Sequence, residues 1–127
     1  MNASLAMKSY HQVHATGMVT DANPHRLVQM LMQGVLDALS KARGAMEYDD
    51  VAGRTHQLNR SVEMISYLRE CLNIKEGGDI AANLDRLYAY MLRRLYDANA
   101  HRDRVALEEV ESLMLTVKEG WDGIVDA

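Results

Sequence analysis

The side chains that could support metal or phosphoryl-transfer chemistry in this sequence are mainly its histidines, and their spacing fits neither. A di-iron site in a helical bundle needs a Glu followed three residues later by His on two helices. No Glu of the chain has a His at that spacing. His11 and His14 lie three residues apart, but no acidic residue lies between them. We therefore predict no metal site and interpret all the histidines as solvent-exposed: His11, His14, His25, His56 and His101.

A histidine phosphotransfer domain is the nearest alternative among bundles that do chemistry. Such domains present a His followed by Lys three residues later and then by Gly. His56 is followed instead by Gln57, Leu58, Asn59 and Arg60, which supply neither. A phosphotransfer-like or metal-binding bundle stays open as an alternative, although no motif supports it.

The acidic residues and the single cysteine have structural interpretations. Glu108, Glu109 and Glu111 fall in the first turns of an expected helix, where the helix dipole favours negative charge. We interpret them as a solvated face. The lone Cys71 excludes an internal disulfide, suits a reducing compartment and is interpreted as an inert structural thiol. Because Gly-rich phosphate loops, nucleophile elbows and Cys–His pairs are absent, we predict no catalytic residue, no cofactor and no enzymatic activity.

Composition and charge indicate one globular domain. The 127 residues are 48% hydrophobic and 25% charged, and the single Pro favours long helices. The formal net charge of −4 argues against nucleic acid as a partner. No run of 18 apolar residues is present, and residues 1–9 lack the apolar core of a signal peptide. We therefore expect a cytoplasmic protein whose contact with membranes is only indirect.

Apolar residues recur every three or four positions in four stretches, which predicts four helices. The first follows the expected N-cap Asn23, with Pro24 at its first position, and a break at 47–50 separates it from the second, over 51–72. A loop at 73–78 precedes the third helix, for which Asp79 is the expected N-cap, and a link at 100–103 precedes the fourth. Such short links indicate an all-α fold, an antiparallel up-down four-helix bundle over residues 23–127.

The third helix carries the widest apolar surface. Its stripe consists of Ile80, Leu84, Leu87, Met91, Leu95 and Ala98. Tyr88, Leu92 and Tyr96 widen it beyond what contact with one neighbouring helix requires. We expect the leucines of the stripe and its isoleucine to be mainly core, and the tyrosines to suit contact with a partner. In the first helix, Met30 and Met32 do not fit the stripe, which predicts a surface position for both.

Residues 1–22 are predicted to be a short, flexible N-terminal segment that docks weakly on the bundle. Met7, Tyr10 and Val13 are spaced along one face of a short, weak helix, and Gly17 lets the chain turn back. An open part of the wide stripe would invite aggregation. We therefore interpret the segment as a removable lid in which Tyr10 occupies an apolar site. The alternative is a tail that touches nothing.

Two runs in the third helix carry a family signature: Gly-Gly-Asp-Ile-Ala-Ala-Asn-Leu at 77–84 and Leu-Tyr-Ala-Tyr-Met-Leu-Arg-Arg-Leu at 87–95. They closely resemble the FliS family of flagellin export chaperones. Residues 8–13, 23–31 and 106–124 are similar to further stretches of that family, so the resemblance covers nearly the whole chain. The sequence departs from the family at Met32 and Gln33, where an aromatic residue and then Asp are common. Any partner contact made there is altered.

The resemblance implies a non-enzymatic flagellar export chaperone in the cytosol. Such a protein binds the C-terminal segment of flagellin, prevents premature polymerisation and delivers flagellin to the flagellar type III export gate. The implied partners are that segment, the cytosolic domain of the export gate and an anti-sigma factor. A homodimeric scaffold that uses its spare apolar surface for self-contact is a further alternative. The candidate residues for contact with flagellin are Tyr10, Val13, Met30, Ile80, Asn83, Tyr88, Tyr90, Met91, Arg94 and Tyr96.

Overall fold

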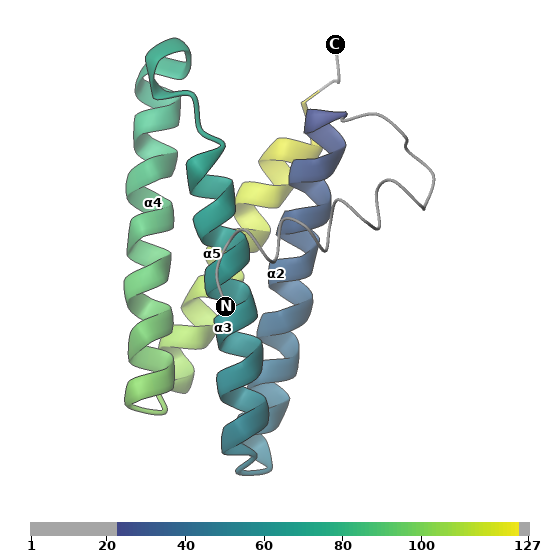
Figure 1. Cartoon of the computed structure of the whole chain (residues 1–127), viewed down its shortest axis with the longest axis vertical. Helices are drawn as coiled ribbons and strands as arrows, with labels where there is room; N and C mark the ends of the chain where they lie inside the picture. Colours follow the sequence, from purple (N-terminus) through teal and green to yellow (C-terminus); the bar gives the residue numbers. More distant parts are fainter. Residues whose placement is uncertain (1–22, 125–127) are drawn as a thin grey trace.

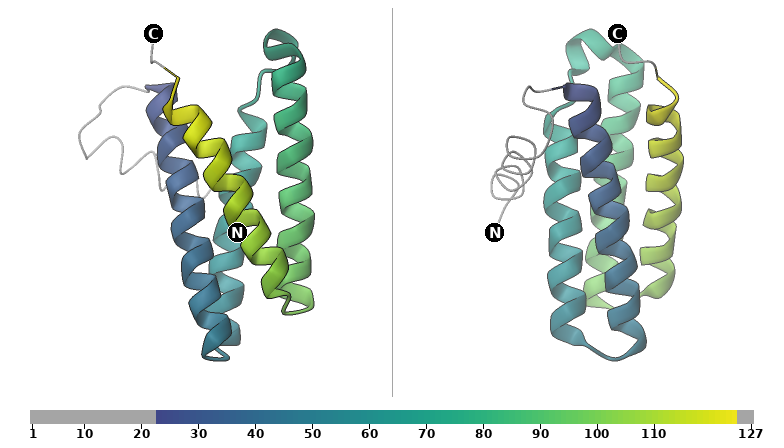
Figure 2. Two further views of the ribbon diagram at one scale, coloured as in Figure 1. Left: turned by 180° about the vertical axis from the view of Figure 1, so that it is seen from behind. Right: turned by 90° about the vertical axis from the view of Figure 1, so that its right-hand side faces the viewer.

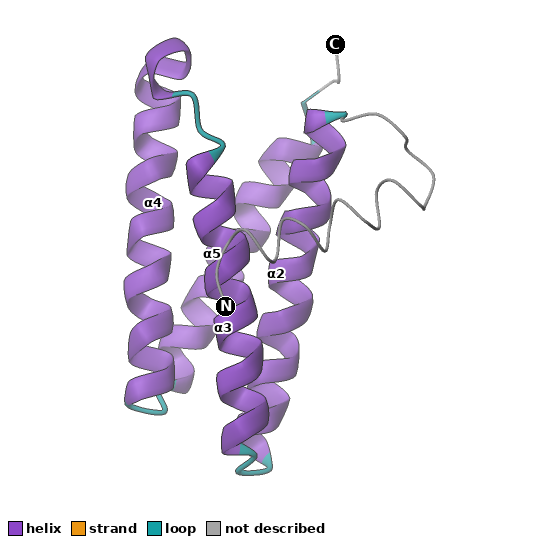
Figure 3. Ribbon diagram, viewed as in Figure 1, coloured by secondary structure: helices purple, strands orange, loops and turns teal. Residues whose placement is uncertain are grey.

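The computed structural model describes residues 23–124, which form four α-helices and no strand. They are α2 (Pro24–Glu47), α3 (Val51–Glu70), α4 (Ile74–Ala100) and α5 (Arg104–Asp122), as Figures 1 and 3 show. The prediction of an all-α fold is confirmed. The N-terminal segment, with Tyr10 and Val13, lies outside the described residues, as does 125–127.

The helices are arranged as a square in cross-section. α2 packs against α3 and α5, and α4 packs against the same two helices. α2 and α4 are therefore diagonally opposite each other, as are α3 and α5 (Figure 2). Successive helices run in opposite directions, so the predicted up-down bundle is confirmed. Within residues 23–124, none of the helices combines the length and apolar character that crossing a membrane requires.

Each helix begins at an Asn or Asp whose side chain accepts a hydrogen bond from a free backbone N–H of the first turn. The side-chain oxygens of Asn23 and Asp103 accept from the N–H groups of Arg26 and Ala106, at 3.3 and 3.0 Å. The Asp50 carboxylate does the same for α3, and the Asn73 amide oxygen for α4. These contacts satisfy donors that a helix leaves unpaired, so they fix where each helix starts.

The beginning of α4 differs from the prediction. A loop was expected over 73–78 with Asp79 as the N-cap, but the helix starts at Ile74 with Asn73 as its N-cap. The helix then bends at Gly78, whose φ of 57° and ψ of −132° are not helical. Glycine adopts this backbone conformation without the steric cost that a side chain would add. The glycine pair therefore marks a bend within α4 rather than its start.

One apolar core fills the space between the four helices. In α2 it takes the predicted stripe, including Leu31, Val35 and Leu39, none of which is exposed. Met32 was predicted to lie at the surface, and this is wrong, because it is only 1% exposed. The reason is that α2 packs on two neighbours, α3 and α5, so its buried arc is wider than one stripe.

The apolar stripe of α4 is buried only along part of its length. Leu95 is in the core and Leu84 and Leu87 pack partly against it, as predicted, but Ile80 is 75% exposed. The prediction of a core position for Ile80 is therefore wrong. The first turns of α4 extend beyond the ends of α3 and α5 (Figure 1). Ile80 lies near the start of this helix, and most of its side chain is left uncovered.

The helices converge at one end of the bundle and diverge at the other. Both views from the side show this (Figures 1 and 2). The closed end holds the α2–α3 turn and the α4–α5 link. At the open end, α2 begins and α5 ends on one side, while α3 ends and α4 begins on the other. The two ends differ in chemistry as well as in spacing.

Candidate binding site

Ion pairs connect the two turns at the closed end of the bundle. Arg102 of the α4–α5 link pairs with Asp49 of the α2–α3 turn. Beside it, the Arg104 Nη2 atom lies 3.1 Å from the Glu47 Oε1 atom. Arg54 of α3 also donates to the Asn99 side chain of α4, at 3.3 Å. These contacts join the α2–α3 turn to the α4–α5 link, and α3 to α4.

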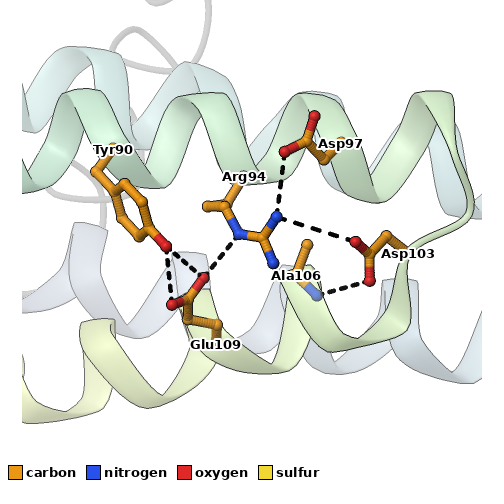
Figure 4. A network of polar contacts seen from close by, with 6 residues as sticks. All are labelled: Tyr90, Arg94, Asp97, Asp103, Ala106 and Glu109. Atoms are coloured by element: carbon orange, nitrogen blue, oxygen red, sulfur yellow. Dashed lines mark hydrogen bonds and ion pairs between the residues drawn. The ribbon is translucent and has the colours of Figure 1, made fainter.

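A polar network ties α4 to α5 along the side of the bundle (Figure 4). The Tyr90 hydroxyl donates to Glu109 at 2.9 Å, and Arg94 Nε donates to the same carboxylate at 2.7 Å. The Arg94 Nη1 atom also reaches Asp97 at 3.2 Å and Asp103 at 3.9 Å. The hydrogen bonds from Arg94 and Tyr90 lower the pKa of Glu109. Tyr90 and Arg94, two candidates for partner contact, are therefore already engaged within the chain.

An apolar pocket lies at the open end, between the diverging helices. It encloses about 220 Å³ and is lined by residues of all four helices, together with Cys71 and Leu72, which follow α3. No charged side chain contributes to its wall. It can therefore accept an apolar group but gives nothing to balance a charge. We call it the open-end pocket, and its lining residues are Val28, Met32, Leu68, Cys71, Leu72, Leu84, Tyr88, Thr116, Val117, Gly120 and Trp121.

His25 and Trp121 hold α2 to α5 at the edge of this pocket. Their rings stack with centroids 5.0 Å apart and an interplanar angle of 16°. The prediction that His25 is solvent-exposed is therefore wrong, because the Trp121 ring covers part of it. The Trp121 Nε1 group donates to the His25 carbonyl at 3.0 Å, and His25 Nε2 lies 3.0 Å from the Trp121 carbonyl. Gln29 donates to Asp122 at 2.8 Å in the same place. The pocket thus has one firmly held wall, which is built by the only tryptophan of the chain.

Cys71 and Tyr88 also line the open-end pocket. Cys71 ends α3 and is exposed, although the sequence suggested a structural thiol. Tyr88 is only 2% exposed. Burial, with a smaller effect of Cys71, raises the pKa of Tyr88 to about 12, and burial and Cys71 likewise raise the pKa of Tyr67 to about 12. The hydroxyls of Tyr88 and Tyr67 are therefore uncharged at neutral pH.

A second depression lies between α3 and α4, nearer the closed end. It encloses about 360 Å³, and its wall combines leucines with Asn59 and Asn99. Tyr96 is one of the residues that line this depression, and it is 70% exposed. The Tyr96 ring can therefore contact a partner without any rearrangement of the bundle. The depression is more polar than the open-end pocket because of its two asparagines.

The structure separates the sequence-predicted candidates into groups that lie apart. Tyr88 lines the open-end pocket and Tyr96 the second depression. Met30 is half-buried, Ile80 is exposed, and the exposed Asn83 accepts a hydrogen bond from Arg86. Tyr90 and Arg94 belong to the α4–α5 network, while Met91 is fully buried in the core. No single surface includes them all.

Sequence reasoning missed most of the open-end pocket. Leu72 and Trp121 lie at or just past the ends of their helices and were interpreted as ordinary stripe residues, while Val28 was not assigned to a stripe. One signal in the sequence could have revealed the pocket. Apolar side chains lie at the ends of the four helices, and no apolar link covers them. Met32 also lines the pocket. The position where the sequence departs from the family pattern is therefore part of this wall.

No group of three or more His, Cys, Asp or Glu side chains that could hold a metal ion occurs in the described part of the chain. The geometry offers apolar cavities, and polar contacts that join the helices. It defines a helical bundle with binding surfaces at one end and along one side.

Comparison with known proteins places this bundle in a family. The family model described as "Flagellar protein FliS" matches residues 6–127, so the chain belongs to the FliS family. It is 50% identical to flagellar secretion chaperone FliSB of Pseudomonas aeruginosa, over 98% of each chain. It is 39% identical to flagellar secretion chaperone FliS of Salmonella typhimurium, covering 98% of this chain and 93% of the relative. A FliS of Bacillus subtilis is 29% identical over 92% of this chain and 86% of the relative.

The resemblance seen in the sequence is thus confirmed. Family membership supports a role as a flagellar export chaperone and a non-enzymatic function. It also implies a partner that is a flagellar export substrate.

Proposed function

We propose that this chain binds the C-terminal segment of flagellin in the cytosol, prevents its premature polymerisation and delivers it to the cytosolic domain of the flagellar export gate. The observation that carries the proposal is the open-end pocket, an apolar cavity without a charged wall residue in a chain of this family. A chaperone that only holds a client needs such surfaces and no reacting group.

The physical requirement is a large apolar contact. Ordering a disordered segment costs roughly 1–2 kcal/mol per residue in backbone entropy. Amphipathic helices can offset that cost by laying their apolar faces into hydrophobic grooves. The open-end pocket and the second depression provide two apolar anchor points, and Tyr96 and Ile80 add exposed apolar surface. Covering the apolar face of flagellin would also block the face through which it polymerises.

Co-purification with flagellin tests the proposal directly. The chain and flagellin should elute together at 1:1, and flagellin without its C-terminal segment should not bind. A concentration-independent dimer that binds no flagellin would favour the homodimeric scaffold instead.

Two neighbouring residues of α5 provide a matched pair of variants for this experiment. Thr116 lines the open-end pocket and Leu115 does not, although both side chains are exposed. Thr116→Glu should weaken flagellin binding because it places a charge against an apolar wall. Leu115→Glu should bind like the parent chain. Equal affinities for the two variants would contradict binding at the open-end pocket.

A further inference from the structure

The hydroxyl of Tyr88 has no hydrogen-bond partner in the part of the chain that the structure describes. Tyr88 is only 2% exposed and lines the open-end pocket. Within that same part, the only side-chain oxygen that is both sealed from solvent and unpaired is Glu63 Oε1. The small exposed part of Tyr88 therefore includes its hydroxyl oxygen. A buried residue of the pocket wall thus carries a hydroxyl without a partner among the described residues.

A tyrosine hydroxyl without a protein partner is available to a ligand. The hydroxyls of buried tyrosine rings usually find a hydrogen-bond partner. The other wall residues of the pocket that carry a polar side-chain hydrogen are few: Thr116 donates to the Ser112 carbonyl within its own helix, and Trp121 donates to the His25 carbonyl. Cys71 offers only a weak thiol donor. Tyr88 is therefore the strong donor of this pocket that remains available.

The wall of the pocket restricts what the acceptor can be. It contains no Lys, Arg or His to balance a carboxylate or phosphate. An acceptor that enters the pocket should thus be uncharged, such as a backbone carbonyl or a side-chain amide. In a helical ligand the last four backbone carbonyls lack intrahelical partners. An apolar side chain beside such a carbonyl matches both the wall and the donor.

We propose that the open-end pocket receives an apolar side chain at the C-terminal end of a client helix, and that the Tyr88 hydroxyl donates a hydrogen bond to an unpaired backbone carbonyl there. This proposal rests on flagellin binding as the function. It makes Tyr88 a specificity-determining residue, because a helix end satisfies the donor whereas the middle of a helix does not. The part of the bound segment that fills the pocket is therefore a helix end or a bend.

The test compares two tyrosine-to-phenylalanine variants. Tyr88→Phe removes the donor and keeps the ring, whereas Tyr48→Phe removes a hydroxyl from a side chain that is 84% exposed at the end of α2 and lines neither cavity. The probe is the C-terminal segment of flagellin, titrated into each full-length chain. Tyr88→Phe should weaken binding about fivefold or more, as expected for the loss of one hydrogen bond of about 1 kcal/mol. Tyr48→Phe should change the affinity less than about twofold. The melting temperature of Tyr88→Phe should not fall, because its hydroxyl bonds to nothing within residues 23–124.

The single cysteine locates the client independently of affinity. Cys71 lines the pocket and is exposed, so a thiol reagent should modify it in the free chain and much more slowly in the complex. Tyr88→Phe that binds the segment as tightly as the parent would overturn the proposal. So would equal Cys71 reactivity in the free chain and the complex, which would mean that the pocket is filled without a client or not used by it. A parent chain that binds no segment at all would instead refute the proposed function, and this inference with it.

Discussion

Asp49 and Arg102 pair with each other, and they are the two residues other than glycine that have positive φ angles in the described part of the chain, 55° and 51°. One lies in the α2–α3 turn and the other in the α4–α5 link. Tight turns at the closed end force both into the left-handed region, which costs a residue with a side chain roughly 1–2 kcal/mol. Their ion pair offsets part of that cost and joins the two turns.

Replacing Arg102 tests this backbone strain. Arg102→Gly and Arg102→Val both lose the ion pair, which is exposed and worth about 0–1 kcal/mol. Only glycine relieves the left-handed conformation. Arg102→Gly should therefore remain more stable than Arg102→Val by roughly 1–2 kcal/mol in urea unfolding. Equal stabilities would show that the link relaxes to another conformation.

The position of a residue along α4 decides how much its side chain contributes to the free energy of unfolding. Leu95 and Ile80 belong to the same apolar stripe, yet Leu95 is 1% exposed and Ile80 is 75% exposed. Leu95→Ala should lower the free energy of unfolding by roughly 2–5 kcal/mol. Ile80→Ala should change it by less than about 0.5 kcal/mol, as is usual for surface sites. A comparable loss from both would mean that the first turns of α4 are covered.

Ionisation of two glutamates in α5 should affect stability in opposite directions. Hydrogen bonds from Arg94 and Tyr90 lower the pKa of Glu109 below its ordinary 4.5. Its stabilising effect is therefore present above pH 4.5 and lost as the pH falls through the lowered pKa. Burial raises the pKa of Glu111 above 4.5 despite the nearby Arg43. Its contribution is thus full below pH 4.5 and lost as the pH rises through the raised pKa.

Urea unfolding of Glu109→Gln and Glu111→Gln at pH 7 and at pH 3 separates these effects. Relative to the parent chain, Glu109→Gln should be less stable at neutral pH, and the difference should shrink in acid. The stability of Glu111→Gln relative to the parent chain should be higher at neutral pH than in acid. If both variants shifted in the same direction between the two pH values, the assigned causes would be wrong.

Much of the fold follows from sequence patterns, but the binding surface does not. The caps at Asn23 and Asp103 were predictable because the residue types that bind free N–H groups are few. The exposed Ile80 and buried Met32 were not, because periodicity gives the face of a helix and not how far each neighbour extends along it or on how many sides it packs. The open-end pocket depends on the divergence of four helices, which no single stretch of sequence records.

Residues 1–22 lead directly into α2, whose first turns border the open-end pocket. We expect this segment to act as the removable lid suggested by Met7, Tyr10 and Val13. Deleting residues 1–17 should leave the bundle folded while raising the binding of a hydrophobic dye and self-association. Unchanged dye binding in a truncated chain that stays as monodisperse as the parent would refute the lid.

Calorimetric titration of the full-length chain with the C-terminal segment of flagellin tests the central claim most directly. We predict 1:1 binding with a large negative heat-capacity change, because the contact is mainly apolar, and an affinity that depends little on salt. Absence of binding would contradict the proposed function. An affinity that falls steeply with added salt would show that charged residues, rather than the apolar pocket, hold the client.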